Sequence, residues 1–523
     1  MYAPIHFRID AADLHAHLYG VTLTIAKPAA NQQVALPVWI AGSYMVREFA
    51  KQITGITAQQ GKRPIALQQI DKCTWQLSCE AGQPLTLHYQ VHAHDDSVRT
   101  AWLDTHRGFF NGTSLCLQVL GQADVPHHLE LVAASFNQPR ATPWQVATGL
   151  TPVKIDRQGF GTYVATDYDE LVDCPVEMGA FWSGSFKACG IEHRFVVAGA
   201  TPAFDGERLL RDTQKICETA ISFWHGKKRS HIPHKRYVFM LNAVADGYGG
   251  LEHRNSTALI CNRADLPRLS DSKSHDAKQS EGYTTLLGLI SHEYFHTWNV
   301  KRLRPAEFAH YDYTQENYTE LLWFFEGFTS YYDDLLLRRA GLLDDVMRGL
   351  WARCHTRPRQ GPMQEADVLA VLKELTGRSW AAEFKAWVHG TRDLPLEKLL
   401  ASHGVRVHHE PAQLAQRLGL RAVEDHSVQI KTVLHGSAAH RAGFAPGDEW
   451  LGVETTGKTA SAWRIKKLDD LLLYAGTAKK VVALVSRDRQ LIKLNLTLPH
   501  AQDHASWRLS IDNAKHVSRW LAL

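Results

Sequence analysis

The chain has 523 residues, more than one hydrophobic core usually serves, so about two to four domains are expected. Its composition, 45% hydrophobic and 21% charged, is that of a globular protein in water. The formal net charge of +4 is too small for this length to indicate a nucleic acid or an anionic membrane surface as a partner, and we expect neither.

Eight cysteines are scattered without a C-x-x-C pair, which favours reduced thiols over a disulfide framework. The N-terminus lacks the basic start and apolar run of a secretory signal, and no run of about eighteen apolar residues could span a membrane. These features predict a cytoplasmic protein.

Residues 1–180 show the alternation that is typical of β-strands. Val21, Leu23 and Ile25 alternate with polar or small neighbours, and the stretch 85–91 does the same. Turn residues separate these runs, so we predict an antiparallel β-domain, a sandwich.

After residue 180 the pattern changes to helices with a few strands. We predict, in chain order, a helix over 207–225, strands over 236–243 and 257–261, helices over 283–299 and 315–339, and further helices over 342–402. From residue 403 the pattern returns to strands, with a helix over 465–474, a hairpin over 481–498 that turns at Asp488, and a tail of uncertain structure at the end.

The predicted helix 283–299 contains the pattern H-E-x-x-H. His292 and His296 are four residues apart, so they share a helix face and can direct two imidazoles at one metal ion. Glu326, in a mostly apolar stretch of the next helix, is a costly carboxylate to bury without a partner. We predict that it is the third ligand of a zinc ion, although a glutamate bonded to a neighbouring helix is the simpler alternative.

Two histidines and one glutamate leave one position open on a tetrahedral zinc ion, which is the layout of a catalytic site. Glu293 points about 100° away from His292 on the helix, so it cannot easily bind the same ion. It is placed to take a proton from a metal-bound water and pass it to a leaving amine. This arrangement suits amide hydrolysis.

The stretch Gly249-Gly250-Leu251-Glu252 lies between two predicted strands shortly before the metal helix. The two glycines allow the backbone of a substrate to approach closely. Glu252 could bind the ammonium group of a peptide N-terminus. Alone the pattern would indicate a plain turn, but beside a zinc-peptidase helix we predict an amine-binding site.

These motifs resemble the glycyl aminopeptidase family of PDZ-containing zinc metallopeptidases, which are thermolysin-like gluzincins. The similarity lies in residues 292–302 and 325–332, and in 37–44, 169–177 and 249–253. It covers nearly the whole chain and implies a multidomain α+β fold. The domains would be an N-terminal antiparallel β-sandwich-like domain (1–180), a thermolysin-like, mostly helical zinc-peptidase domain (181–402), a C-terminal PDZ domain (403–500) and a C-terminal tail (501–523).

The resemblance implies one zinc ion per chain, bound by His292, His296 and Glu326, with Glu293 as base and Glu252 holding the substrate amine. Residues 436–448 resemble part of a PDZ domain. Leu418-Gly419-Leu420 matches the PDZ loop whose N–H groups hold a terminal carboxylate, so C-termini of peptides or proteins are candidate partners.

One departure from the family concerns the oxyanion of the transition state. In relatives, the helix that corresponds to the predicted helix 315–339 is followed by a longer segment. That segment holds a Ser-Tyr-Tyr-type stretch that could donate a hydrogen bond to the oxyanion. Here the segment is short, and no tyrosine occurs between Tyr332 and Tyr474. Such a donor is typically worth about 10²–10³ in rate. Either Tyr248, Tyr331 or Tyr332 substitutes, or the chain is a weak or inactive peptidase that keeps its metal site.

Our first hypothesis is therefore a cytoplasmic zinc aminopeptidase that acts on peptides, with the preference for N-terminal glycine or alanine implied by the resemblance. The alternative is a metal-binding pseudoenzyme that binds peptides through its PDZ domain. A third hypothesis is an endopeptidase in which Glu252 is merely structural.

Overall fold

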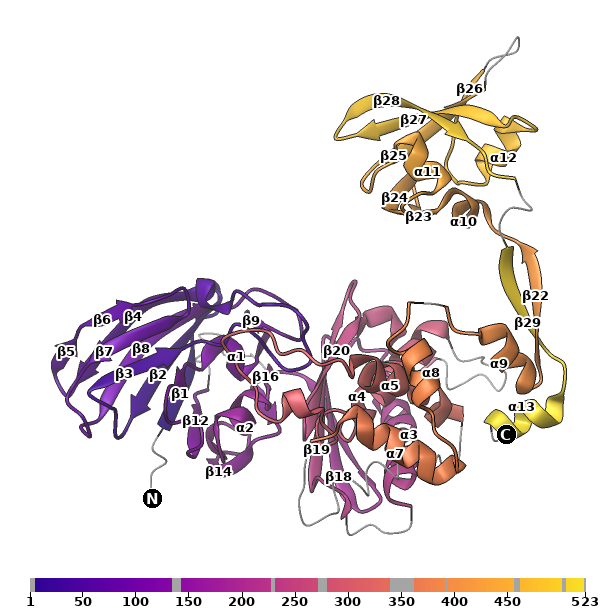
Figure 1. Cartoon of the computed structure of the whole chain (residues 1–523). Helices are drawn as coiled ribbons and strands as arrows, with labels where there is room; N and C mark the ends of the chain where they lie inside the picture. Colours follow the sequence, from indigo (N-terminus) through magenta and orange to yellow (C-terminus); the bar gives the residue numbers. More distant parts are fainter. Residues whose placement is uncertain are drawn as a thin grey trace. The chain divides into compact units, whose positions relative to one another are not determined.

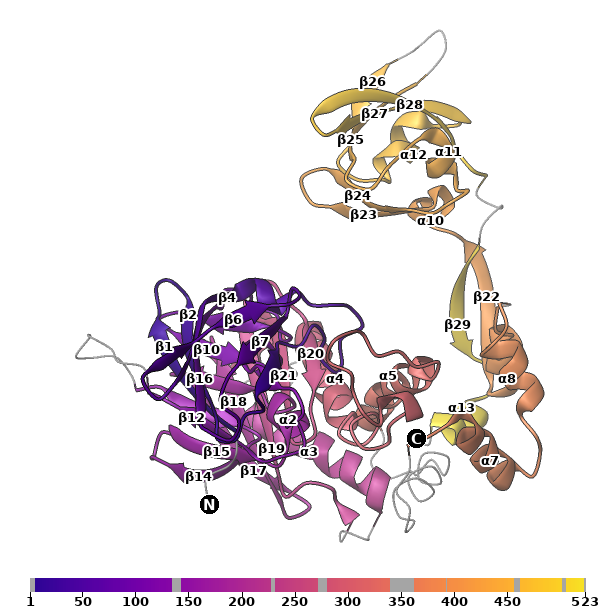
Figure 2. The same cartoon turned by 60° about the vertical axis from the view of Figure 1, so that its left-hand side comes forward.

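A computed structural model describes residues 5–133, 143–226, 231–270, 280–338, 362–391, 393–455, 461–500 and 505–521. The chain divides into two compact units, Met1–Gly390 and Thr391–Leu523, each of which is described by itself (Figures 1 and 2). No helix in the described part of the chain is long and apolar enough to cross a membrane. The predicted domain boundaries at residues 180, 402 and 500 remain predictions.

The first unit begins with the predicted β-domain, drawn in indigo to purple in Figure 1. Its largest sheet has eight strands in the order β14 (Thr151–Ile155), β15 (Gly161–Ala165), β12 (His127–Leu131), β1 (Ile5–Asp13), β2 (Leu18–Ile25), β8 (Leu85–His92), β4 (Ile53–Gln60) and β5 (Arg63–Ile65). Neighbouring strands are antiparallel except β1 and β12, which are parallel. More than a hundred residues separate these two strands, which is ample for the crossover that a parallel pair needs.

Two four-stranded sheets complete the β-domain. Their orders are β13 (Gln145–Thr148), β16 (Val176–Gly179), β10 (Arg107–Phe110), β9 (Ala101–Leu103), and β11 (Gln118–Val119), β3 (Asn31–Ala35), β7 (Thr74–Ser78), β6 (Leu67–Gln69). Two short helices, α1 (Gly112–Leu115) and α2 (Tyr168–Val172), connect strands. The predicted alternation is confirmed, since Val21, Leu23 and Ile25 are all buried in one core between the sheets.

The second half of the first unit has a five-stranded sheet covered by helices. The strand order is β17 (Trp182–Ala188), β18 (Ile191–Ala198), β19 (Arg236–Val244), β21 (Ser256–Asn262) and β20 (Gly249–Glu252), with the three central strands parallel and the outer two antiparallel. Helices α3 (Gly206–His225) and α4 (Glu281–Phe295) pack on this sheet, and α5 (Leu322–Arg338) packs against α4 (Figure 1).

Helix α3 has the predicted bounds within one residue, and Asp205 caps it by accepting a hydrogen bond from Arg208 N. The glycine and glutamate stretch at 249–252, which would alone indicate a turn, forms the edge strand β20. Two further helices of this unit, α7 (Glu365–Thr376) and α8 (Ala381–Trp387), agree with the predicted helical region. Part of that region, 339–361, lies outside the described residues.

The prediction for α5 is wrong at its start, because the helix begins at Leu322 and not near residue 315. The preceding residues form a turn built by side chains. The Asp312 side chain accepts hydrogen bonds from Thr314 N and from the Thr314 hydroxyl. The Asn317 side chain accepts a hydrogen bond from Asp312 N and donates one to Asp312 O. These side chains offer the backbone an alternative to the helix.

The second unit contains α9 (Leu396–Ser402), a two-stranded ribbon and a six-stranded sheet. The ribbon pairs β22 (Val405–Pro411) with β29 (Ala505–Ile511). The sheet is ordered β23 (Leu420–Glu424), β24 (Val428–Val433), β25 (Glu449–Glu454), β27 (Lys480–Arg487) and β28 (Gln490–Thr497), with β26 (Ala462–Arg464) beside β25. Helices α10 (Leu414–Leu418), α11 (Ala438–Ala442) and α12 (Asp470–Ala475) accompany it.

This unit has its own core around Trp450. The predicted hairpin is confirmed, and its turn residues Asp488 and Arg489 both have positive φ, 47° and 66°, as a tight two-residue hairpin requires. The predicted helix 465–474 is wrong in its first part, because Asp470 accepts hydrogen bonds from Lys466 N and Lys467 N in a turn before α12. The segment 501–523, predicted as a tail, contains β29 and α13 (Ala514–Leu521).

Candidate active site

Helix α4 carries the H-E-x-x-H pattern into the interior of the first unit. Ser280 caps its start by accepting a hydrogen bond from Tyr283 N. The helix ends at Phe295, so His296 is its C-cap residue and not a member of the predicted longer helix. Its backbone still has helical angles, φ −60° and ψ −18°, which preserves the spacing of four from His292. His296 is buried and His292 is partly exposed.

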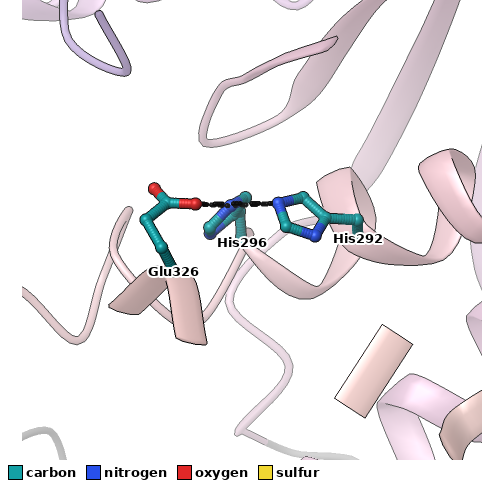
Figure 3. A group of neighbouring side chains, drawn as sticks. All are labelled: His292, His296 and Glu326. Carbon is teal, nitrogen blue, oxygen red and sulfur yellow. Dashed lines mark hydrogen bonds and ion pairs between the residues drawn. The ribbon is translucent and has the colours of Figure 1, made fainter. Parts of the chain in front are cut away.

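Three side chains converge from α4 and α5 (Figure 3). The Nε2 atoms of His292 and His296 are 3.1 Å apart. Glu326 Oε2 lies 3.8 Å from His292 Nε2 and 3.7 Å from His296 Nε2. The ligand atoms all lie within 4.8 Å of one another, and no other such group occurs among the described residues.

The other nitrogen of each ring has a hydrogen-bond acceptor. His292 Nδ1 donates to Asp333 Oδ2 at 2.8 Å, and His296 Nδ1 donates to the backbone oxygen of Asn299 at 2.8 Å. Each neutral ring therefore carries its hydrogen on Nδ1 and directs a free lone pair from Nε2 toward the other ring. Two lone pairs and a carboxylate oxygen that face one another repel unless a cation lies between them, so the donor set fits a bound zinc ion.

Asn299 fixes the end of α4 against α5. Its side-chain nitrogen donates to Phe325 O at 3.1 Å and to the Thr329 hydroxyl at 3.0 Å. The same residue supplies the backbone oxygen that orients His296. The distance between the histidines on α4 and Glu326 on α5 therefore depends on the hydrogen bonds that Asn299 makes between the two helices.

Glu293 is buried next to this group, with 5% of its surface exposed. Its Oε2 atom is buried and has no hydrogen-bond partner in the described part of the chain. Burial raises its pKa above the ordinary value, and the nearby carboxylate of Glu252 raises it further, more than His292 lowers it. The strand β20 lies directly against it, since a Cβ atom on Gly250 would be 2.2 Å from Glu293 Oε1.

Glu252 lies at the end of β20 and is also buried. Burial opposes its ionisation, but His296 and Lys301 lower its pKa below the ordinary value. When Glu252 and Glu293 share one proton, that proton therefore belongs on Glu293. Both carboxylates line one open cleft of about 360 Å³, together with His292, His296 and Glu326.

The Peptidase M61 N-terminal domain matches residues 6–180, and the M61 glycyl aminopeptidase domain matches residues 285–369. The crystal structure of an aminopeptidase N family protein from Idiomarina loihiensis is similar to this chain, with a TM-score of 0.86 and 30% sequence identity. The alignment covers 99% of this chain and 100% of that protein's chain. The chain belongs to the M61 glycyl aminopeptidase family. It is therefore a metallopeptidase of the aminopeptidase type.

More distant structures are also found. An M1 zinc metallopeptidase mutant from Deinococcus radiodurans is 14% identical, covers 75% of this chain and 94% of its own, and gives a TM-score of 0.43. A comparison with curated proteins finds no match.

The three tyrosines predicted as candidate oxyanion donors lie in different surroundings in this M61 peptidase. Tyr248 lines the cleft. Tyr331 follows on α5 and is 40% exposed, outside the cleft lining. Tyr332 is buried in the core, with its ring 5.0 Å from that of Phe223 and 5.6 Å from that of Phe295. The structure thus brings only Tyr248 of the three to the cleft. The shortened segment that follows lies partly at 339–361, outside the described residues.

Several residues of the M61 site were missed by sequence reasoning. Asp333 lies seven residues after Glu326, two turns along the same helix face, and that spacing could have revealed it. Three further residues come from the N-terminal β-domain and also line the cleft: Gly42, Tyr44 and Arg99. The Arg99 guanidinium donates to Gly250 O at 3.2 Å, and the Tyr44 hydroxyl donates to Glu326 Oε1. Gly42 and Tyr44 belong to the stretch 37–44 that resembles the family, so that resemblance could have marked them. No local pattern marks Arg99, because its contact is formed only by the fold.

The predicted carboxylate loop, Leu418-Gly419-Leu420, lies in the second unit at the junction of α10 and β23. Gly419 has φ +72° and ends the helix, and its N–H donates to Gln416 O at 3.1 Å. Leu420 begins β23, which is the edge strand of its sheet in the described part of the chain.

Proposed function

We propose that this M61 peptidase is a zinc-dependent aminopeptidase that removes an N-terminal residue, glycine or alanine, from peptides. The observation that carries the proposal is the pair of Nε2 lone pairs facing Glu326 Oε2, with both Nδ1 atoms already donating elsewhere. His292, His296 and Glu326 would hold one zinc ion per chain. A zinc ion held there would polarise the peptide carbonyl and lower the pKa of a water molecule.

The residues of the chain supply the remaining chemistry. Glu293 is the general base, which takes a proton on its carboxylate and passes it to the leaving amine. Its burial suits this role, and so does its Oε2 atom, to which no group among the described residues donates a hydrogen bond. Glu252 stays ionised and accepts the ammonium group of the substrate N-terminus. Gly249 and Gly250 let the substrate backbone lie close to β20, and the cleft residue Tyr248 is our candidate for the oxyanion donor.

The test uses zinc-loaded full-length protein and three matched peptides: glycyl, alanyl and N-acetylglycyl forms of one short sequence. We expect release of glycine or alanine from the first two and no cleavage of the third. Equal cleavage of the acetylated peptide would favour the endopeptidase alternative, in which Glu252 is structural. One zinc per chain without turnover of any peptide would favour the pseudoenzyme.

We also propose that residues 403–500, within the second unit, form a PDZ domain that binds C-termini of peptides or proteins, and that the protein is cytoplasmic. The position of Leu418 to Leu420 at the start of β23, the edge strand of this sheet in the described part of the chain, supports the first part, because PDZ ligands add a strand beside such a loop. Binding of a fluorescent peptide with a free C-terminus, but not of its amidated form, would test this. The scattered cysteines support the second part, and the seven in the described residues form no disulfide.

A further inference from the structure

A loop of the N-terminal β-domain reaches into the cleft of the peptidase sheet. The hydroxyl of Tyr44 in this loop donates a hydrogen bond to Glu326 Oε1. The other carboxylate oxygen, Oε2, faces the two histidines at 3.8 and 3.7 Å. Figure 3 shows Oε2 directed at the histidines. The two oxygens of Glu326 therefore have separate partners, one from the β-domain and one toward the metal position.

The loop is held in place on both sides of Tyr44. Ser43 N donates to Ile40 O at 3.0 Å, and the Ser43 hydroxyl accepts from Arg47 Nε at 3.1 Å. Gly42 has φ +86°, and a Cβ atom on it would lie 2.6 Å and 2.8 Å from the two carboxylate oxygens of Glu252. Only glycine fits this conformation at this distance. The loop thus contacts both Glu252, the proposed ammonium-binding residue, and Glu326, the proposed metal ligand.

The contact with Tyr44 can fix the orientation of the Glu326 side chain. Its side chain is 34% exposed, and its two histidine neighbours are themselves candidate ligands. Among the described residues, Tyr44 is the one hydrogen-bond donor to its second oxygen. A glutamate on a helix surface has several rotamers of similar energy, so a hydroxyl that binds one oxygen selects the rotamer that presents the other.

We propose that Tyr44 is a positioning residue of the metal site: the N-terminal β-domain completes the site by holding Glu326 in the geometry that binds the metal. This inference rests on the proposed zinc site. It assigns a role in metal affinity to a domain that contributes no ligand.

The test is the zinc affinity of full-length Tyr44→Phe, measured by competition with a chromophoric chelator. This variant keeps the ring and removes only the hydroxyl. Supporting residues of this kind typically contribute about 10- to 100-fold in metal affinity, and we expect a loss in that range. The melting temperature of the metal-free variant should equal that of the metal-free parent, since the hydroxyl does not pack in the core. Tyr248→Phe, which alters another tyrosine of the same cleft, is the control and should bind zinc as the parent does.

A double-mutant cycle shows whether Tyr44 acts through Glu326. In a Glu326→Ala background, Tyr44→Phe should cause no further loss of zinc affinity. If Tyr44→Phe binds zinc as tightly as the parent, or if its effect persists without Glu326, the inference is overturned while the zinc site stands. If the parent itself binds no zinc, the proposed function fails, and the inference fails with it.

Discussion

At the scale of single residues, the contact between Gly250 and Glu293 sets the geometry of the cleft. A side chain at position 250 would overlap the Glu293 carboxylate, so a glycine is needed there for steric reasons and not for its backbone freedom. The same close packing buries Glu293 and raises its pKa. A general base works best when its pKa lies near the operating pH, so a glutamate whose pKa is raised from its ordinary acidic value toward neutrality suits this role.

Glu293→Gln removes the proton acceptor and preserves the size and shape of the side chain. We expect the variant to bind one zinc ion per chain and to lose about 10²–10⁴-fold in kcat, the usual contribution of a positioned base. Metal analysis together with steady-state kinetics on a glycyl peptide would check both parts. Parent-like turnover would refute the assignment of the base.

Gly250→Ala tests the steric argument. The added Cβ atom would meet Glu293 Oε1 at 2.2 Å, so the carboxylate must move, and a displacement of about 1 Å typically costs about 10²-fold in rate. The control is Gly288→Ala, in the same cleft lining, where a Cβ atom meets nothing within 4 Å. That variant should retain activity, and its helix should become more stable by about 1 kcal/mol. Equal activity of the two variants would contradict the steric argument.

At the scale of secondary-structure elements, one buried carboxylate joins three segments of the first unit. Asp173 follows α2 and lies 2.6 Å from Lys301 Nζ, in the turn after α4. Its Oδ1 also accepts from His253 Nδ1, just after β20, at 3.3 Å. Burial alone would raise the pKa of Asp173, but the charge of Lys301 and the hydrogen bond from His253 hold it well below its ordinary value.

We therefore predict a specific acid dependence of stability. Because the folded-state pKa is depressed, Asp173 stabilises the fold fully above its unfolded pKa of about 3.9, and this contribution is lost as pH falls further. Asp173→Asn should cost about 3–5 kcal/mol at neutral pH, since Lys301 is left buried without a counter-charge. Its free energy of unfolding should then fall less steeply than that of the parent below about pH 4.

Urea unfolding at a series of pH values would measure this, with Asp246→Asn, at an exposed aspartate, as the control. The control should follow the parent. Parallel pH profiles for Asp173→Asn and the parent would contradict the prediction.

How much the sequence predicts depends on whether a contact is local. The histidines and Glu293 lie within five residues, so helix periodicity is enough to place them together. Tyr44 and Glu326 are 282 residues apart along the chain, and only the packing of two domains brings them into contact. The start of α5 differs from the prediction for a related reason, because the Asn317 side chain donates to the backbone oxygens of Asp312 and Gln315 and holds this stretch in a turn.

At the scale of the whole molecule, the hydrophobic cores define which parts unfold together. The core of the N-terminal β-domain continues into the peptidase sheet through Leu251, Ala258 and Ile260. The second unit has a separate core around Trp450. Residues that share a core lose their packing together, so we expect the β-domain and the peptidase sheet to unfold in one transition and the second unit, with its own core, in another.

Metal removal should therefore affect one thermal transition and not the other. A ligand that binds only the native state at 1,000 times its Kd stabilises that state by about 4 kcal/mol, which corresponds to about 5 °C for a unit of this size. We expect calorimetry to show two transitions, of which chelation lowers only the one that belongs to the first unit. Glu293→Gln should keep this shift and His296→Ala should abolish it, because only the second loses a proposed ligand. A shift of both transitions would mean that the units are coupled, and no shift with zinc present at saturation would count against the metal site.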